Sequence, residues 1–466
     1  MAALQLGCSS VSHKAMLPEG PTQAPRKIAI YFDGTHNDEA SDTNVKKLHS
    51  LVSLQDRQGL ATLWIEGVGT GIDLPGMALG YGTSTRVRLA YEFLLHHYRA
   101  GDQIYIFGFS RGAWNARVLT SMLFNAGLPK WPGHTASENA DTAFSVFKGT
   151  YRPSQDDLQA CDEVDRLKIL DHAKRRAAVQ RCLQKLRFEG TDSVSVDVLG
   201  LWDTVEALGF PDWGPRILHK LGITPLTVDI DLPNRRYGDQ LCNVRLALQA
   251  LSIDDNREWI FTPLPLVRQH LLSGCPTLPG EHILSADGKV RPGRLKEVWF
   301  SGAHSDVGGG YATSMMSGVS LNWMLEELVA SKSGLIPGDA KAKVRQDPYG
   351  SSHDPEAGLP AGIGYHAISR NIAAWPLEPG QRMEFVGSLC VHPTVFARRR
   401  ALAVQSHENG QLRLLQPQTV CLEPDLDDGF SKPQRMREVV GKEQPCDGET
   451  AKAIRIEVAP HCQAME

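Results

Sequence analysis

The sequence predicts an α/β fold in which a mostly parallel central sheet carries helices on both faces. Short apolar runs that end in glycine or Asp-Gly turns alternate with segments of helical spacing, as strands and helices do along such a sheet. The apolar runs have few polar interruptions, which is typical of strands buried on both faces. The chain has 466 residues, 42% of them hydrophobic and 22% charged, so it can bury a large core.

The first half of the sheet is predicted from residues 27 to about 124. The run KIAIYFDGTHND, residues 27–38, predicts a strand that stops at an Asp-Gly turn, and LATLWIEGVGTG, residues 60–71, repeats that pattern. IYIFGF, residues 104–109, predicts another strand with a helix directly after it. Residues 84–103 between them have helical spacing, with an apolar side made of Val87, Tyr91, Leu94, Leu95 and Tyr98.

The second half follows a change of character. Residues from about 125 to 190 are polar, strongly charged and helical in pattern. Because connections after parallel strands emerge at the carboxyl edge of the sheet, we expect this insertion to form a helical cap over that edge. The strand pattern resumes at residues 192–205, ALQALSIDD (residues 247–255) has a helical pattern, and a further strand begins near residue 296. A helix is predicted over residues 319–331.

These patterns divide the chain into a leader of residues 1–26, an α/β domain of residues 27–335 and a C-terminal extension of residues 336–466. The leader is rich in Pro and small polar residues, which predicts a disordered cytosolic segment or a lipoprotein-type linker. With a start upstream of Met1, Cys8 would be the acylated residue of a lipoprotein signal. The extension contains short strand-like pieces, and we expect it to pack on the α/β domain.

Composition excludes several function classes. A net charge of -4 and a pI near 6.5 are not those of a typical nucleic-acid binder, and the basic triplet at residues 174–176 is expected to be a solvated helix face. The 9 cysteines lack metal-ligand spacing and CxxC pairs, so we expect mostly buried thiols and neither a zinc site nor a disulfide scaffold. No apolar run approaches the ~18 residues of a membrane span, so contact with lipid would be peripheral.

The segment Gly108-Phe109-Ser110-Arg111-Gly112 has the pattern G-x-S-x-G between a predicted strand and a predicted helix. This context is that of a nucleophile elbow, a sharp turn that holds a serine in a strained conformation with its hydroxyl presented. Gly108 and Gly112 would prevent clashes with the neighbouring strand and helix. Ser110 is therefore the candidate nucleophile, and the alternative is a serine that only caps the helix.

A serine nucleophile needs a histidine base and a carboxylate that orients it, in the chain order Ser, Asp, His for this elbow. Asp203 ends the strand near residue 200, and His304 ends the next strong strand and precedes a glycine cluster. The rivals are Asp197, which lies inside the predicted strand, and His366. Asp306 is a second group that would orient His304, although we expect it to support the loop. Gly308–Gly310 would allow close backbone approach there.

Acyl transfer also needs N–H donors for the developing oxyanion. The backbone amide of Arg111 follows the nucleophile, and the Gly34-Thr35 turn is the candidate for the second donor, with a plain Asp-Gly turn as the alternative. A metal site at Asp33, His36 and Asp38 is disfavoured because no other cluster has ligand spacing. No cofactor or metal is expected.

Four motifs occur in order: IYFDGTHND, GFSRGAWNARVL, GLWDTVEALG and FSGAHSDVGGGY. Together they resemble the α/β-hydrolase family that includes the type VI secretion lipase effectors of family one, which are bacterial phospholipases. The resemblance covers about residues 27–335 and implies an α/β-hydrolase fold with Ser110 as nucleophile, Asp203 as acid and His304 as base. It implies hydrolysis of a glycerophospholipid ester at a membrane surface. For an effector it further implies a cytoplasmic protein before export, a secretion-system partner and an immunity protein.

The residues leave two other functions open. The same site would serve an esterase or thioesterase acting on a non-lipid substrate, because substrate preference depends on cap and loop side chains. A binding protein that kept the fold and lost the chemistry is the third hypothesis.

Overall fold

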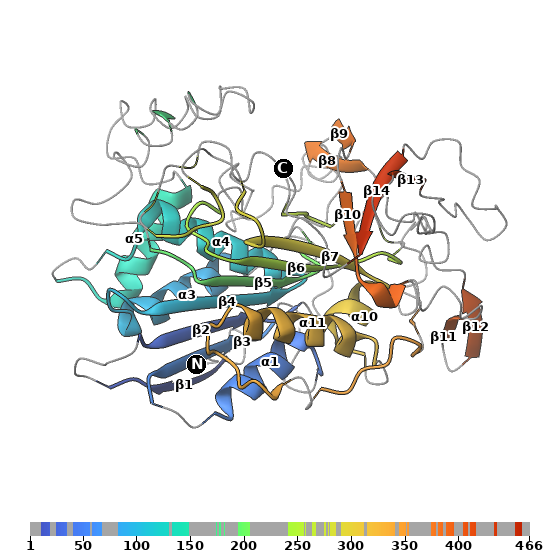
Figure 1. The fold of residues 1–466 in the computed structure, drawn as a ribbon. Helices are drawn as coiled ribbons and strands as arrows, with labels where there is room; N and C mark the ends of the chain where they lie inside the picture. Colours follow the sequence, from blue (N-terminus) through green and yellow to red (C-terminus); the bar gives the residue numbers. More distant parts are fainter. Residues whose placement is uncertain are drawn as a thin grey trace, which may run out of the picture.

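A ten-stranded sheet forms the centre of the molecule in the computed structural model (Figure 1). The structure describes residues 11–18, 25–34, 41–55, 58–67, 83–129, 133–148, 194–205, 241–255, 281–285, 290–311, 315–340, 344–350, 374–378, 381–384, 388–395, 404–408, 411–415, 433–435 and 453–458, with single residues and short stretches between residues 174 and 353. The strands in sheet order are β1 (Val11–Met16), β3 (Leu60–Ile65), β2 (Lys27–Phe32), β4 (Gln103–Phe109), β5 (Val198–Trp202), β6 (Ala247–Ser252), β7 (Leu295–Phe300), β10 (Ser388–Val391), β14 (Ala453–Val458) and β13 (Pro433–Arg435).

All neighbouring strands from β3 to β14 in this order are parallel, and only the edge strands β1 and β13 run antiparallel. Phe32 at the end of β2 pairs with Ile65 of β3 and with Gly108 of β4, so the carboxyl ends of these strands meet at one edge. The prediction of a mostly parallel α/β-hydrolase-like sheet is confirmed. In such sheets, loops at the carboxyl edge carry the functional groups.

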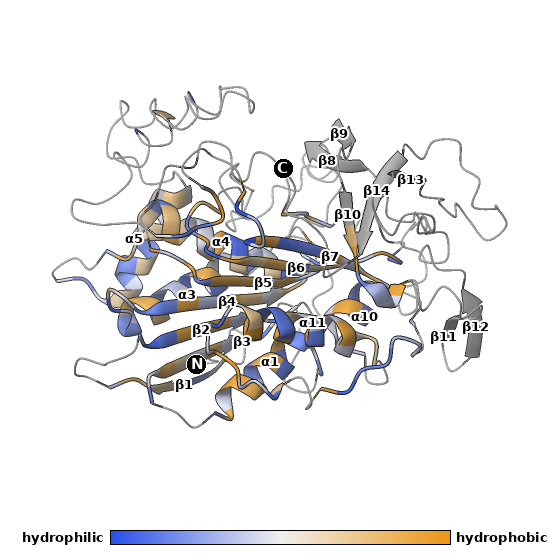
Figure 2. Ribbon diagram, viewed as in Figure 1, coloured by the Kyte–Doolittle hydropathy of each residue, from blue (hydrophilic) through white to orange (hydrophobic). Residues whose placement is uncertain are grey.

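Helices cover both faces of the sheet, as predicted (Figure 1). They are α1 (Asn44–Ser53), α3 (Thr83–His97), α4 (Arg111–Ala126), α5 (Ala136–Lys148), α10 (His304–Gly308) and α11 (Ser317–Ala330). Alternate residues of β2 enter opposite cores: Ile28 and Ile30 pack with α3, α4 and α5, whereas Tyr31 packs with α1 and α11. Figure 2 shows hydrophobic residues running through the central strands, which is the pattern of a sheet covered on both sides.

One element was predicted wrongly: residues 247–252 form β6, not a helix. Alanine, leucine and glutamine are good helix formers, which explains the helical pattern. Every residue of β6 is buried between β5 and β7, however, and pairing on both sides overrides local propensity.

The leader is not wholly disordered, because Val11–Met16 form β1 and pair with β3. Much of β1 is exposed, as is common for an edge strand. Its hydrophobic pattern is therefore too weak to predict a strand from the sequence. The end of the leader is also fixed, since the buried Arg26 side chain pairs with Asp102 at 2.5 Å. Cys8 lies outside the described residues.

The start of the predicted cap belongs to the helical layer. In α5, the side chains of Ala140, Phe144 and Phe147 are buried in the core shared with α3 and α4. Asp141 of α5 pairs with Arg88 of α3 at 2.7 Å. Residues 136–148 therefore do not form a cap over the carboxyl edge. The remainder of the expected cap, including residues 165–188, lies outside the described residues except for single positions.

A disulfide joins Cys242 and Cys275, so these two cysteines are not among the buried thiols expected for most of the nine. Cys390 is also disulfide-bonded. The two paired cysteines are 33 residues apart in the sequence, and such a pairing follows from the fold and not from a local motif.

Reduction of this disulfide is expected to lower the free energy of unfolding by about 2–4 kcal/mol, because the unfolded chain gains the freedom of the closed loop. The measurement is denaturant unfolding of the protein and of Cys242→Ser with Cys275→Ser, with and without reductant. An oxidised wild-type protein with the same midpoint as the double variant would contradict the pairing.

The chain beyond residue 335 contacts the α/β domain at several points. Ile336 and Ala340 are buried in the core next to α11. Val391 of β10 pairs with Trp299 of β7, and the His392 ring stacks on Phe300 with centroids 4.8 Å apart. Two small hairpins, β8 (Ala374–Glu378) with β9 (Gln381–Glu384) and β11 (Val404–Glu408) with β12 (Gln411–Leu415), also belong to this part.

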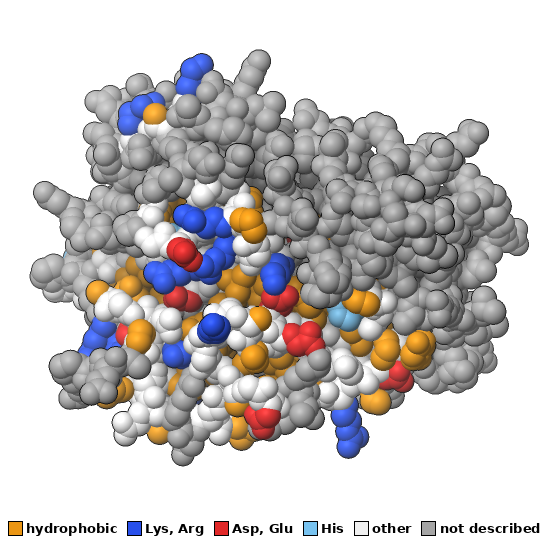
Figure 3. All heavy atoms as spheres, viewed as in Figure 1, with side chains coloured by type: hydrophobic (Ala, Val, Ile, Leu, Met, Phe, Trp, Pro, Cys, Tyr) orange, Lys and Arg blue, Asp and Glu red, His pale blue; other side chains and the backbone are white. Residues whose placement is uncertain are grey.

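The surface that is described mixes both signs of charge. On the face shown in Figure 3, several lysine and arginine side chains lie near one another, with aspartate and glutamate side chains beside them. Among the helices in the described part of the chain, none combines the length and the apolar character needed to cross a bilayer.

Candidate active site

Ser110 occupies a strained turn between β4 and α4. Its backbone angles, φ 58 and ψ -127, are rare for a residue with a side chain, and the hydroxyl makes no capping hydrogen bond to α4. The Ser110 amide instead donates to the carbonyl of Trp202 at the end of β5, at 3.0 Å. The turn has the geometry of a nucleophile elbow and not that of a serine helix cap.

The glycines on either side make this turn sterically feasible. A Cβ atom on Gly108 would lie 2.6 Å from the Cα of Ala113 at the start of α4. A Cβ atom on Gly112 would overlap the carbonyl of Phe32 and lie 2.5 Å from that of Asp33. Both glycines therefore allow backbone segments to approach more closely than any side chain permits.

Gly112→Ala is expected to destabilise the fold by about 3 kcal/mol or more, because backbone atoms of β2 cannot move aside as a flexible side chain can. Gly338→Ala is the matched control, since a Cβ atom there meets nothing within 4 Å. Denaturant unfolding of both variants measures the difference. A Gly112→Ala protein as stable as Gly338→Ala would show that the packing at the elbow is looser than described.

Asp203 follows β5 and is completely buried. It is a second residue with a positive φ, 41°, which turns its carboxylate toward the loops after β6 and β7. The carboxylate accepts hydrogen bonds from the amide and the hydroxyl of Ser252, at 2.9 and 3.1 Å. Asp203 Oδ2 also lies 2.5 Å from Nδ1 of His304.

His304 begins α10, directly beyond the loop that follows β7. Its side chain is 5% exposed, and its ring packs on Phe109, the residue before Ser110, with centroids 4.7 Å apart. Burial lowers the pKa of His304 below its ordinary 6.5, and the hydrogen bond that His304 donates to Asp203 opposes that shift. The imidazole is thus neutral near pH 7, with the Nδ1 proton donated to Asp203 and Nε2 left as the basic nitrogen.

The three expected groups thus come from the carboxyl ends of β4, β5 and β7. Val205 donates its amide to the Ser110 carbonyl at 3.4 Å, which ties the elbow to the loop that holds Asp203. Gly308 of α10 packs against the Phe109 ring, where a Cβ atom would overlap it. The glycine cluster after His304 therefore allows α10 to approach the elbow closely.

The rival residues have other surroundings. Asp197 precedes β5 at the opposite edge of the sheet, where it accepts the Ile104 amide at 2.9 Å. Asp306 accepts the Ala303 amide and binds Nδ1 of His353 at 2.8 Å, so it supports the loop and does not orient His304. His366 lies outside the described residues.

The oxyanion donors are only partly as expected. Arg111 begins α4 directly after Ser110, where its backbone amide adjoins the candidate nucleophile. The Gly34 amide, in contrast, donates to Oδ1 of Asp33 at 2.8 Å, so the second expected donor is engaged within its own Asp-Gly turn. That local bond satisfies a buried amide next to a buried carboxylate. Thr35 lies outside the described residues.

Asp33 fixes the loop after β2 beside the elbow. Burial raises the pKa of Asp33 to about 7, although the hydrogen bonds donated by Thr43, Gly34 and Trp64 lower it. The Thr43 hydroxyl and the Trp64 indole donate to Oδ2 at 2.8 and 3.1 Å. His36 and Asp38 of the disfavoured metal site lie outside the described residues, and the described ones include no group of three His, Cys, Asp or Glu arranged to hold a metal ion.

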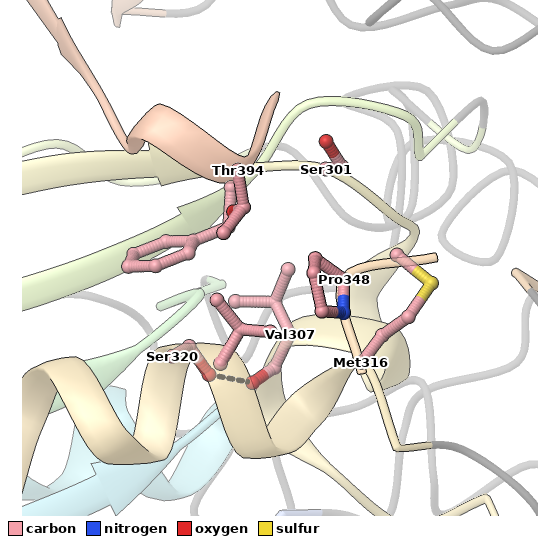
Figure 4. Close-up of a pocket in the computed structure, with 8 residues that line it drawn as sticks. Ser301, Val307, Met316, Ser320, Pro348 and Thr394 are labelled. Atoms are coloured by element: carbon pink, nitrogen blue, oxygen red, sulfur yellow. Dashed lines mark hydrogen bonds between the residues drawn. The ribbon is translucent and has the colours of Figure 1, made fainter. Parts of the chain in front are cut away.

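A small cavity lies between α10, α11 and the end of β7 (Figure 4). The Ser320 hydroxyl donates to the Val307 carbonyl at its edge, at 2.5 Å. The cavity has room for about one water molecule and cannot hold a substrate. Its lining consists of Phe300, Ser301, Val307, Met316, Val319, Ser320, Pro348 and Thr394.

Comparison with known proteins gives weak overall similarity to several of them. The uncharacterized protein YEL023C of Saccharomyces cerevisiae is 24% identical over 324 residues, which cover 63% of this chain and 42% of the yeast protein. An uncharacterized protein from Pseudomonas aeruginosa has a TM-score of 0.34 at 17% identity, covering 69% of this chain and 49% of the other.

An esterase from Thermogutta terrifontis, solved with propionate, has a TM-score of 0.32 at 13% identity and covers 70% of this chain and 90% of its own. A Tle1 effector bound to the VgrG spike of the type VI secretion system has a TM-score of 0.27 at 18% identity. The match covers 62% of this chain and 52% of the effector chain. This chain thus spans about half the length of the first relatives that it matches.

Residues 26–327 match the model of the catalytic domain of Tle1-like phospholipase effectors of the type VI secretion system. This stretch contains the elbow, Asp203 and His304, and it amounts to more than half of the chain. The chain therefore belongs to the Tle1-like phospholipase effector family.

Proposed function

We propose that the protein is a serine hydrolase that cleaves carboxylic esters of glycerophospholipids, as a phospholipase A does. The observation that carries the proposal is the buried hydrogen bond between Asp203 and His304, whose ring packs directly beside the strained elbow of Ser110. A serine on an elbow, an imidazole and a buried carboxylate form the group that activates a hydroxyl for acyl transfer.

The chemistry proceeds through an acyl-enzyme. His304 Nε2 takes the proton of the Ser110 hydroxyl as its oxygen attacks the ester carbonyl carbon. Asp203 holds the ring and stabilises the imidazolium that forms. The Arg111 amide donates to the oxyanion of the tetrahedral intermediate. As the intermediate collapses, His304 gives its proton to the departing glycerol oxygen, and water then releases the fatty acid by the same two steps.

The family supports the proposed lipid substrate and partners. Its model describes phospholipase effectors, and as part of the proposal a membrane surface supplies the substrate. A related Tle1 effector is bound to the VgrG spike, and we extend a partner of this kind, together with an immunity protein, to this chain as part of the proposal.

Mass spectrometry of lipids after incubation with phosphatidylethanolamine and phosphatidylglycerol vesicles tests the function. The proposal predicts equal amounts of lysophospholipid and free fatty acid. The lysophospholipid should retain the head group of the lipid from which it came. Diacylglycerol or phosphatidic acid as the product would contradict it, because those arise from cleavage at the phosphate. Hydrolysis of soluble esters or thioesters with intact vesicle lipids would assign the site to a non-lipid substrate.

The loss of activity toward acid pH should have its midpoint below pH 6.5, because burial lowers the pKa of His304 from that value. The base works in its neutral form, so kcat/KM falls as the pH decreases through the lowered pKa. A pH profile of kcat/KM with a soluble short-chain ester measures this limb. A midpoint above pH 6.5 would show that the imidazolium is favoured and not disfavoured in the site.

A further inference from the structure

The loop after β6, residues 253–255 and 257, contacts both partners of the Asp203–His304 pair. Ser252 at the end of β6 donates two hydrogen bonds to the Asp203 carboxylate. Three residues later, Asp255 Oδ2 accepts the backbone amide of His304 at 3.1 Å. The acid and the base come from strands on either side of β6, so this segment joins them at a common point.

The loop is itself rigidly held. The side chain of Asp255 is fully buried, and Arg257 binds it through Nε at 3.2 Å and through its terminal nitrogen at 2.7 Å. Asp254 lies beside it and exchanges hydrogen bonds with Gly302, at 3.1 and 2.6 Å. A charge-assisted, two-point Arg–carboxylate contact fixes orientation better than a single bond does.

We propose that Asp255 and Arg257 are positioning residues for His304: Asp255 anchors the start of α10 through the His304 amide, and Arg257 holds Asp255 in place. This proposal rests on the proposed function, in which His304 is the base. Neither residue is assigned a contact with the substrate, and nothing in the sequence pattern singled them out.

The pair also places two opposite charges beside the imidazole. Asp255 raises and Arg257 lowers the pKa of His304, in addition to the larger effects of burial and of the hydrogen bond that His304 donates to Asp203. A negative neighbour stabilises the imidazolium and a positive one destabilises it. Removing the Asp255 charge alone should therefore lower the pKa of His304, and removing the Arg257 charge alone should raise it.

The test is the pH profile of kcat/KM for a soluble short-chain ester with three variants. Arg257→Gln should move the acid limb to higher pH, and Asp255→Asn should move it to lower pH. Asp255→Asn should also lower kcat by about tenfold or more with little change in KM, since the single side-chain oxygen of asparagine cannot accept all the Arg257 and His304 donors that the two carboxylate oxygens accept. The double variant, with both charges removed, should fall between the single ones.

Arg26→Gln and Asp102→Asn are the matched controls, because this buried Arg–Asp pair lies at the opposite edge of the sheet. They should lower thermal stability without moving the acid limb. Arg257→Lys keeps the positive charge, so the acid limb of its pH profile should coincide with that of the wild type. This comparison tests the charge effect even where another variant folds poorly.

Acid limbs that coincide with the wild type, or that move in one direction for both single variants, would overturn the positioning role. Failure of the proposed function looks different: Ser110 would then not react with a fluorophosphonate, and Ser110→Ala would keep esterase activity.

Discussion

Replacing Ser110 with alanine is expected to lower kcat/KM for a short-chain ester by about 10⁴-fold or more, because the reaction loses its nucleophile. The folded state should persist. Alanine accepts the same positive φ as serine at the same strain, and the Ser110 hydroxyl makes no capping bond to α4 that alanine would remove. The measurement combines ester kinetics with thermal unfolding of the purified variant.

Ser121→Ala is the matched control, since Ser121 is a buried serine of the same helix. Its loss should change stability by about 1 kcal/mol or less and leave kcat/KM unchanged. A folded Ser110→Ala protein that keeps wild-type activity would remove the basis for an acyl-enzyme on this residue.

Asp203→Asn is expected to lower kcat by about 10³- to 10⁴-fold, because the amide nitrogen of asparagine would face Nδ1 of His304. That contact favours the wrong tautomer and leaves Nε2 unable to take the Ser110 proton. Asparagine tolerates the positive φ of 41° at this position, so the backbone turn should survive. Ester kinetics on the folded variant give the comparison, with KM expected to change little.

Asp197→Asn is the control that separates the two aspartates considered from the sequence. Asparagine can still accept the Ile104 amide at the amino edge of the sheet. Its kcat should remain within about twofold of wild type, since surface and distant polar changes are mostly small. A larger loss in Asp197→Asn than in Asp203→Asn would reverse the assignment of the acid.

Much of the site was predictable because strand ends are predictable. The apolar runs before Ser110, Asp203 and His304 predict buried parallel strands, and parallel strands end at one edge. The close packing at Gly108 and Gly112 follows from the same local pattern. The predicted boundaries moved by up to six residues: the strand expected over residues 192–205 is Val198–Trp202, and the helix expected over residues 84–103 is Thr83–His97.

Contacts between residues far apart in the chain could not be predicted from the sequence. β6 has helix-forming residues, and only its place between two strands makes it extended. The hydrogen bonds of Ser252 and Asp255 to the acid and the base depend on that placement, so these two residues carried no signal. The Gly34 amide was expected to face the nucleophile, but the neighbouring carboxylate of Asp33 binds it.

The most direct measurement of the central claim is peptide mapping of the protein after reaction with a fluorophosphonate, in the wild type and in His304→Gln. We expect a single adduct on Ser110 in the wild type and an adduct that forms at least about 10³-fold more slowly in His304→Gln, because the base no longer activates the hydroxyl. A folded wild-type protein with no adduct on Ser110, or with equal rates in both proteins, would contradict the account.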